Sequence, residues 1–259
     1  MKTINTYITE KLRISKNKSV KSKKYTLFPE TKPELIQMIK DEVYQNGWNC
    51  SLNHIDTSKI EDMSWIFGKH DYVAFGLEDF NGDISQWDVS NVKDMNSMFV
   101  NNKSFNNDIS EWDVSNVENM AYMFYGSGFN GDVYNWNVSN VENMEGMFES
   151  SPFNGDISDW DVSKVKNMRK MFAYSKFDQP IGNWNVSNVE DMYDMFDNST
   201  FNQPLKYWDI SNVVDMSYIF SDSKFNQDIS NWKINPKCKL SGIFWDCNIN
   251  KEYKPILPK

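Results

Sequence analysis

Residues 83–99 read DISQWDVSNVKDMNSMF, and this stretch decides the fold because close copies of it recur along the chain. Trp stands at positions 87, 112, 136, 160, 184, 208 and 232, at one interval of 25 residues and then at intervals of 24. Phe recurs in step with it, at positions 80, 105, 129, 153, 177, 201 and 225. A fixed period of this size is typical of repeat proteins, in which each unit stacks on the next.

Each repeat predicts a short strand followed by a short helix. Asp108-Ile109-Ser110 alternates polar and apolar residues, as a strand with one buried face does. Val117, Met120 and Phe124 then fall at i, i+3 and i+7, which is one face of a helix. We therefore expect an α/β, leucine-rich-repeat-type solenoid of about eight coils, with short parallel strands on one face and short helices on the other.

Two further patterns recur with the same period. Ser115 and Glu118 have the spacing of a helix capping box, and similar pairs recur in other repeats. An Asn follows most of the recurrent Phe residues and is expected to form a ladder that satisfies backbone groups at each turn. The Phe, Trp and Met columns are interpreted as core, with Met as a flexible filler.

The flanks of the array differ from the repeats. Thr31 with Glu34 predicts a capping box, and Gly47 suits the end of a helix. The expected organisation is a basic arm over 1–24, an N-terminal cap over 25–54 with a capping helix over 33–46, a solenoid over 55–248 and a tail over 249–259.

The unit from Asp83 to Phe99 resembles the BspA-like leucine-rich-repeat surface proteins of bacteria. The resemblance covers roughly residues 50–248 and rests on seven near-identical copies. It implies a leucine-rich-repeat fold and action through protein–protein contact, in many members as secreted or surface adhesins. Such repeats also occur in gut bacteria, anaerobic protists and phages.

Catalytic and cofactor chemistry is not expected. The chain has three Cys and two His and lacks a phosphate loop, a nucleophile elbow, a Cys-x-x-Cys pair and a His-Glu-x-x-His motif. We therefore predict neither an enzyme nor a bound cofactor or metal. One alternative concerns Asp83, Asp108, Asp132, Asp156 and Asp228, which share one repeat position. These carboxylates either bind calcium or accept hydrogen bonds from the backbone or water, and the second interpretation is favoured.

Binding of a partner is expected where bulky residues replace the residue that most repeats have at the same position. Tyr134, Lys206 and Tyr207 do so on the predicted strand side, and Tyr122 and Tyr218 occupy matching positions on the predicted helix side. Exposed Tyr is enriched at recognition surfaces. The alternative is scattered surface variation without a function.

Charge is divided unevenly between the arm and the array. Residues 1–24 carry a net charge of +7 within a chain of net charge −9. Lys11, Arg13, Lys16 and Lys18 are therefore candidates to contact an acidic partner, whereas the acidic solenoid would repel nucleic acid. No stretch is long and apolar enough for a transmembrane segment.

The function that these patterns favour is a non-enzymatic protein–protein interaction scaffold in a bacterium or phage, with a protein partner. The chain begins without a secretory signal, so the expected location is the cytoplasm, or the virion or host cytoplasm for a phage product. The alternative is a cell-surface adhesin whose export signal is missing from this sequence. An enzyme or a calcium-dependent glycan binder is a third, less favoured class.

Overall fold

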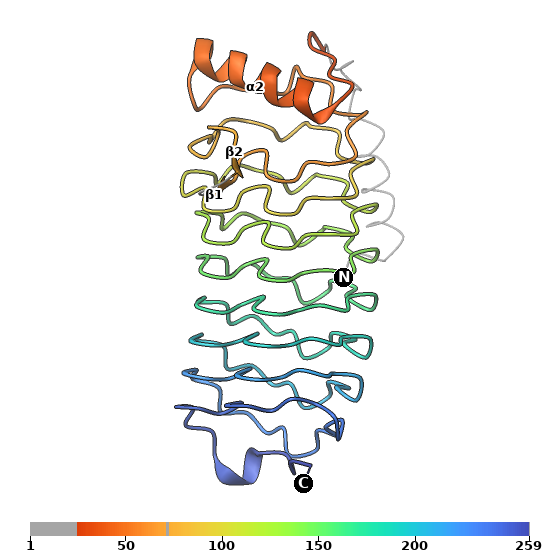
Figure 1. Ribbon diagram of the computed structural model, residues 1–259, viewed down its shortest axis with the longest axis vertical. Coiled ribbons are helices and arrows are strands. Elements are labelled where there is room, and N and C mark those ends of the chain that lie inside the picture. Colours follow the sequence, from red (N-terminus) through yellow and green to blue (C-terminus); the bar gives the residue numbers. More distant parts are fainter. Residues whose placement is uncertain (1–24, 71–72, 259) are drawn as a thin grey trace, which may run out of the picture.

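A computed structural model describes residues 25–70 and 73–258, in which similar coils stack into one elongated column (Figure 1). Helix α2, Lys32–Asn46, lies across one end, and the short 3-10 helix η1, Lys251–Tyr253, lies at the other. The remaining elements are two antiparallel strands of two residues each, β1 (Lys69–His70) and β2 (Val73–Ala74).

The expected α/β solenoid of strands and helices is wrong. Within the described ranges, successive coils are joined by isolated parallel bridges rather than by strands, and α2 is the one α-helix. The bridges join one residue of each coil to the next: Asp62, Asp94, Asn119, Asn143, Asn167, Asp191, Asp215 and Lys239.

The backbone hydrogen bonds explain why no helix forms after each Val-Ser-Asn-Val. The N–H groups of Met120, Tyr122 and Phe124 donate to carbonyls of the next coil at 2.6–3.0 Å. The intervening N–H groups of Met123 and Tyr125 donate to the carbonyl three residues back, at 3.1–3.2 Å. An α-helix would need all these donors for its own i−4 carbonyls, so the inter-coil bonds replace it.

The expected strands and repeat capping boxes are replaced by turns centred on Asp. The Asp108 carboxylate accepts the Ser110 N–H at 3.0 Å, which folds Asp-Ile-Ser into a turn. In the same way, Asp113 accepts the Ser115 N–H at 3.1 Å, while Glu118 donates its N–H to a carbonyl of the preceding coil at 2.9 Å. The Asp and Ser residues therefore stabilise turns, and each coil lacks an extended face.

The core is built from aligned aromatic rings. One column of Phe rings runs through Phe99, Phe124 and Phe148, with neighbouring centroids 5.6–5.7 Å apart and nearly parallel planes. A second column lies against it, as where Phe124 and Phe129 approach to 4.2 Å. The Trp, Met and Phe residues of the seven regular repeats are buried as predicted. Each described coil therefore buries its apolar residues only when another coil covers them.

Polar ladders lock one coil to the next. The indole N–H of Trp160 donates to the Val133 carbonyl at 3.1 Å, and each of the seven periodic Trp residues makes an equivalent bond. The predicted Asn ladder is confirmed, because the Asn130 side chain accepts the N–H of Asn154 at 3.0 Å and the pattern repeats. Asp178 substitutes for Asn in this column and accepts in the same way, at 2.8 Å.

Helix α2 closes the apolar end of the stack. Its residues Leu35, Ile36, Ile39 and Val43 are buried in the common core. Thr31 accepts the Glu34 N–H at the start, and Gly47 ends the helix with a φ of 83°. This helix closely matches the range 33–46 expected from the sequence.

Candidate binding face

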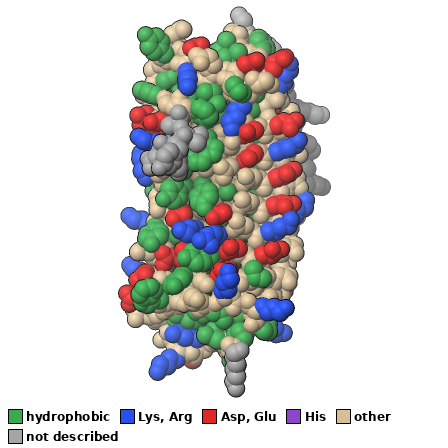
Figure 2. All heavy atoms as spheres, viewed as in Figure 1, with side chains coloured by type: hydrophobic (Ala, Val, Ile, Leu, Met, Phe, Trp, Pro, Cys, Tyr) green, Lys and Arg blue, Asp and Glu red, His purple; other side chains and the backbone are tan. Residues whose placement is uncertain are grey.

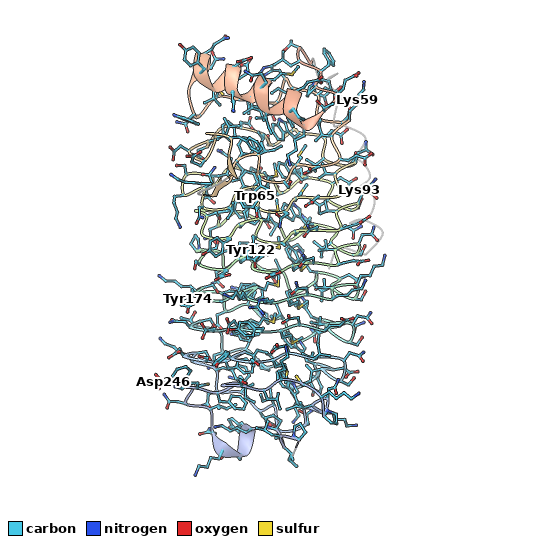
Figure 3. The ribbon with its side chains drawn as sticks, viewed as in Figure 1. Lys59, Trp65, Lys93, Tyr122, Tyr174 and Asp246 are labelled. Atoms are coloured by element: carbon cyan, nitrogen blue, oxygen red, sulfur yellow. The ribbon has the colours of Figure 1, made fainter. Side chains whose placement is uncertain are left out.

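One side of the column carries residues whose chemistry changes from coil to coil. Each coil contains a Met-x-x-Met-Phe segment or, toward the ends of the array, its counterpart. We define the variable face as four residues of each such segment, the two after the first Met and the two after the Phe. This face runs from Ser64 to Asp246. In Figure 3, Trp65 and Tyr122 of this face lie near the middle of the column and Tyr174 lies at its left edge, whereas Lys59 and Lys93 lie at the right edge. The Met and Phe between these positions are buried, so the variable residues are displayed on a constant support.

Left-handed backbone conformations position the side chains of the variable face. The second residue of each first pair has a positive φ, including 64° at Trp65, 55° at Tyr122 and 57° at Lys170. This region costs a non-glycine residue about 1–2 kcal/mol. The inter-coil hydrogen bonds fix the conformation, and such local strain tends to cluster at functional sites.

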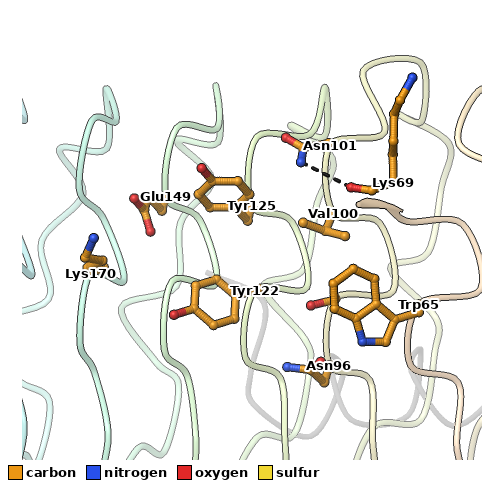
Figure 4. A pocket seen from close by; sticks show the side chains of 10 residues that line it. Trp65, Lys69, Asn96, Val100, Asn101, Tyr122, Tyr125, Glu149 and Lys170 are labelled. Carbon is orange, nitrogen blue, oxygen red and sulfur yellow. Dashed lines mark hydrogen bonds between the residues drawn. The ribbon is translucent and has the colours of Figure 1, made fainter. Parts of the chain in front are cut away.

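A groove of about 820 Å³ opens within the variable face (Figure 4). Its lining consists of Trp65, Lys69, Asn96, Ser97, Val100, Asn101, Tyr122, Tyr125, Glu149 and Lys170. All these residues belong to the variable face, so the groove is formed by the positions at which the repeats differ. The Tyr122 and Tyr125 rings meet edge to face, 6.0 Å apart.

Beside the groove, an arginine lies between a tyrosine and a carboxylate. The Arg169 guanidinium lies 3.8 Å from the centre of the Tyr193 ring, and its Nε lies 3.6 Å from the Glu145 carboxylate. The Tyr122 hydroxyl also donates to Glu145. Burial and the neighbouring Glu145 raise the pKa of Tyr122, so this hydroxyl stays protonated and acts as a donor.

Glu149 is the most unusual charged group in the groove. Its side chain is buried, and burial raises the pKa of its carboxyl to about 7, although Lys170 opposes the shift. Among the described residues, its carboxylate makes no hydrogen bond or ion pair. The groove lysines have other acidic neighbours, since Lys69 lies 3.7 Å from Glu78 and Lys170 lies 3.8 Å from Asp194.

Aromatic residues continue along the face beyond the groove. Tyr193 meets Tyr218 edge to face at 5.9 Å, and Tyr218 lies 6.3 Å from Trp245. Tyr174 and Trp245 are 55% and 67% exposed, which leaves large apolar areas facing solvent. Figure 2 shows hydrophobic and charged side chains intermixed over the side of the column seen there. A surface of this composition is typical of protein-binding sites.

The structure separates the residues that the sequence had grouped. Tyr122 and Tyr218 lie on the variable face, four coils apart. Tyr134, Lys206 and Tyr207 lie instead in the Asp-Ile-Ser turn segments, where Tyr134 donates to Asp159 and Lys206 pairs with Asp228 at 3.3 Å. Lys11, Arg13, Lys16 and Lys18 lie outside the described residues.

Several residues of the face were missed from the sequence. Trp65, Tyr125, Glu149, Tyr193 and Trp245 were not among the predicted binding residues. The signal that could have found them is the change of residue type after Met and Phe, because the rest of the repeat is nearly constant. This change of residue type was overlooked because the segments were interpreted as separate helices, with these positions on their solvent-exposed sides.

The Asp column has a structural role in the turns. Asp83, Asp108, Asp132, Asp156 and Asp228 each accept the N–H of the residue two positions later, at 2.9–3.0 Å. The favoured interpretation, hydrogen bonding to the backbone, is thus confirmed. Over residues 25–70 and 73–258, no group of three or more His, Cys, Asp or Glu is arranged to hold a metal ion. No helix in this part of the chain is both long and apolar enough to cross a membrane.

The comparisons with known proteins give a family. No curated protein and no solved structure matches the chain. One family model, described as "Mycoplasma protein of unknown function, DUF285", matches twice, over residues 35–154 and 149–254. These two matches span most of the chain and follow the period of the aromatic columns. The chain therefore belongs to the DUF285 family.

Proposed function

We propose that this chain is a non-enzymatic scaffold that binds a protein partner through its variable face. The observation that carries the proposal is the contrast within each coil, where a nearly constant buried framework supports four positions on one side that differ from coil to coil and of which several are exposed. Repeat proteins commonly use such a rigid, extended surface for recognition. The aromatic and arginine content of the face is also typical of residues that dominate binding energy.

The experiment compares two pairs of tyrosines from different segments of the coil. The first variant replaces Tyr174 and Tyr193 on the variable face with Ser. The second replaces Tyr134 and Tyr207 in the Asp-Ile-Ser turns with Ser. Both variants and the full wild-type chain are used to capture partners from a lysate of the source cells, and the captured proteins are quantified by mass spectrometry.

The expected result is a discrete protein that binds the wild type and the Tyr134/Tyr207 variant equally but is lost from the Tyr174/Tyr193 variant. Loss only with Tyr134 and Tyr207 would move recognition to the turn segments. Equal capture by all three proteins would contradict binding through either surface. Melting temperatures of the three proteins show whether a loss of binding arises from unfolding.

A second candidate is a bacterial cell-surface adhesin, supported by the resemblance of the unit from Asp83 to Phe99 to BspA-like surface proteins. The two candidates differ in location, the scaffold being a cytoplasmic protein, or a virion or host-cytoplasm protein if phage-encoded. Protease treatment of intact source cells distinguishes them. Digestion of the chain before lysis supports the adhesin, and protection until lysis supports the scaffold.

A further inference from the structure

We propose that the groove on the variable face binds an arginine side chain of the partner protein, with Glu149 as its counter-charge and the Tyr122 and Tyr125 rings beside it. This inference rests on the proposed protein-binding function and names the chemistry that the partner presents. Figure 4 shows Glu149, Tyr122 and Tyr125 around the same opening.

The first argument is the lack of a partner for Glu149. Its side chain is only 7% exposed, and the described residues give its carboxylate neither a hydrogen bond nor an ion pair. The carboxylate keeps only a small contact with solvent, so its charged form is poorly hydrated, and a cation that reaches it recovers part of that cost. The groove provides a route for such a cation from solvent.

The second argument is that the two lysines of the groove have other partners. Lys69 lies 3.7 Å from Glu78, and Lys170 lies 3.8 Å from Asp194. Lys170 and Arg169 act on Glu149 from a distance, but within the described residues no cation lies close enough to form an ion pair with it. A cation supplied from outside would complete the pairing of charges in the groove.

The third argument is an example of the same arrangement in the adjacent part of the face. There, Arg169 lies 3.8 Å over the Tyr193 ring and 3.6 Å from the Glu145 carboxylate. The groove offers the same kinds of group, tyrosine rings and a carboxylate, without an internal arginine among its lining residues. A planar guanidinium stacks on aromatic rings and pairs with carboxylates at once, which favours arginine over lysine.

The volume of the groove, about 820 Å³, exceeds one side chain and leaves room for the backbone that carries it. The net charge of the whole chain is −9, which favours approach of a basic partner. The occupant is therefore an arginine in a protein segment rather than a free small cation.

The test titrates the full chain with two probes at pH 8, N-acetyl-arginine methylamide and its uncharged analogue N-acetyl-citrulline methylamide. Calorimetry measures binding to the wild type, Glu149→Gln and Tyr125→Leu. Glu118→Gln is the matched control, because it removes the same charge from an exposed position outside the groove.

We expect the arginine probe to bind the wild type and Glu118→Gln equally and Glu149→Gln at least tenfold more weakly. Tyr125→Leu, which keeps an apolar side chain but loses the ring, weakens binding several-fold. The citrulline probe does not bind. Lowering the pH from 8 to 6 weakens binding by roughly tenfold as Glu149 is protonated, given its pKa of about 7.

The groups that face Glu149 also enter this pH dependence. They are Glu145, Arg169, Lys170, Asp194, Tyr122 and Tyr174, and of these Asp194 has a pKa raised to about 6. The Glu149→Gln protein retains these groups, so any pH dependence that remains in it belongs to them. A pH dependence identical to that of the wild type would overturn the role of Glu149.

Three other results would overturn the proposal: equal binding of the citrulline probe, equal binding by Glu149→Gln, or an equal loss in Glu118→Gln. Melting temperatures verify that each variant is folded. If the arginine probe does not bind while partner capture still depends on Tyr174 and Tyr193, arginine binding in the groove is refuted and the scaffold function is retained. If the probe binds through Glu149 while no partner depends on the face, the scaffold function falls instead.

Discussion

The ring of Tyr122 lies over Gly146, the residue at the same position of the next coil, so closely that a Cβ atom on Gly146 would overlap it. Tyr218 lies over Gly242 in the same way. A large ring in one coil is thus matched by a missing side chain in the next. The variable face is therefore shaped by pairs of residues about one repeat apart.

Replacing Gly146 with Ala is expected to destabilise the chain and displace Tyr122. Gly146 has a φ of 57°, so Ala costs about 1–2 kcal/mol in backbone energy before any steric overlap. The overlap then weakens the hydrogen bond from Tyr122 to Glu145. Urea unfolding measures the free-energy change. Gly76→Ala is the control, because Gly76 has a φ of 74° and nothing within 4 Å of an added Cβ. Equal losses in both variants would contradict the steric role of Gly146.

Glu149→Gln is expected to stabilise the chain at high pH. The pKa of Glu149 is raised from 4.5 to about 7, so the folded state binds more protons than the unfolded state between these values. The free energy of unfolding therefore falls as the pH rises through this window. Because the carboxylate retains some contact with solvent, we expect a loss of about 1–2 kcal/mol, less than the full shift implies.

Melting temperatures at pH 5 and pH 8 check this prediction. The wild type is expected to lose stability relative to Glu149→Gln between these two values. Asp194 also has a raised pKa, about 6, and is present in both proteins, so it enters the difference only through its coupling to Glu149. Parallel changes in both proteins would refute the assignment of the titration to Glu149.

The Asn ladder is expected to tolerate Asp but not Ala. Asn130 accepts the N–H of Asn154 at 3.0 Å, and Asp178 performs the same task two coils further along the chain. Asn130→Ala is expected to cost about 1 kcal/mol because this N–H loses its acceptor. Asn130→Asp keeps the acceptor and is expected to cost less than about 0.5 kcal/mol. Urea unfolding of both variants measures these values, and similar losses would show that the acceptor is unimportant.

Ser150→Gly is expected to raise stability. Ser150 has a φ of 56° at the position that Gly126 occupies in the preceding coil. Glycine relieves about 1–2 kcal/mol of strain and costs about 0.5–1 kcal/mol in chain entropy, for a net gain of up to about 1.5 kcal/mol. Ser158→Gly is the control and is expected to lose stability, since Ser158 is not among the positive-φ residues. A loss in both proteins would contradict the prediction.

The repetitive core could be predicted from the sequence, because large apolar residues that recur with a fixed period are buried whatever the local backbone conformation. The Trp and Phe columns, the Asn ladder and the backbone-bonded Asp residues follow from the period alone. The helices could not be rejected in the same way. Val117, Met120 and Phe124 have helical spacing, and the choice between a helix and alternating turns depends on donors such as the Tyr122 N–H, which bonds to another coil.

The candidate site was predicted only in part, because it also depends on backbone conformations and contacts that form between coils. Tyr and Lys rarely adopt a positive φ, so the sequence does not reveal that Tyr122 and Lys170 do. Only the stacking of coils brings Tyr122 beside Glu145 and Glu149. The emphasis on Tyr134 and Tyr207 came from interpreting Asp-Ile-Ser as the face of a sheet, which the turn at each Asp replaces.

The alternation of backbone donors along Met-x-x-Met-Phe also determines how this column responds to force. Every second N–H in the segment is bonded to the adjacent coil, as at Met120, Tyr122 and Phe124, so each coil is bonded along its rim to its neighbour. Tension applied between the two ends would peel a terminal coil away, breaking these bonds in sequence rather than all at once. Each detached coil would release about 80 Å of chain. Under such force the column would therefore lengthen in nearly equal steps.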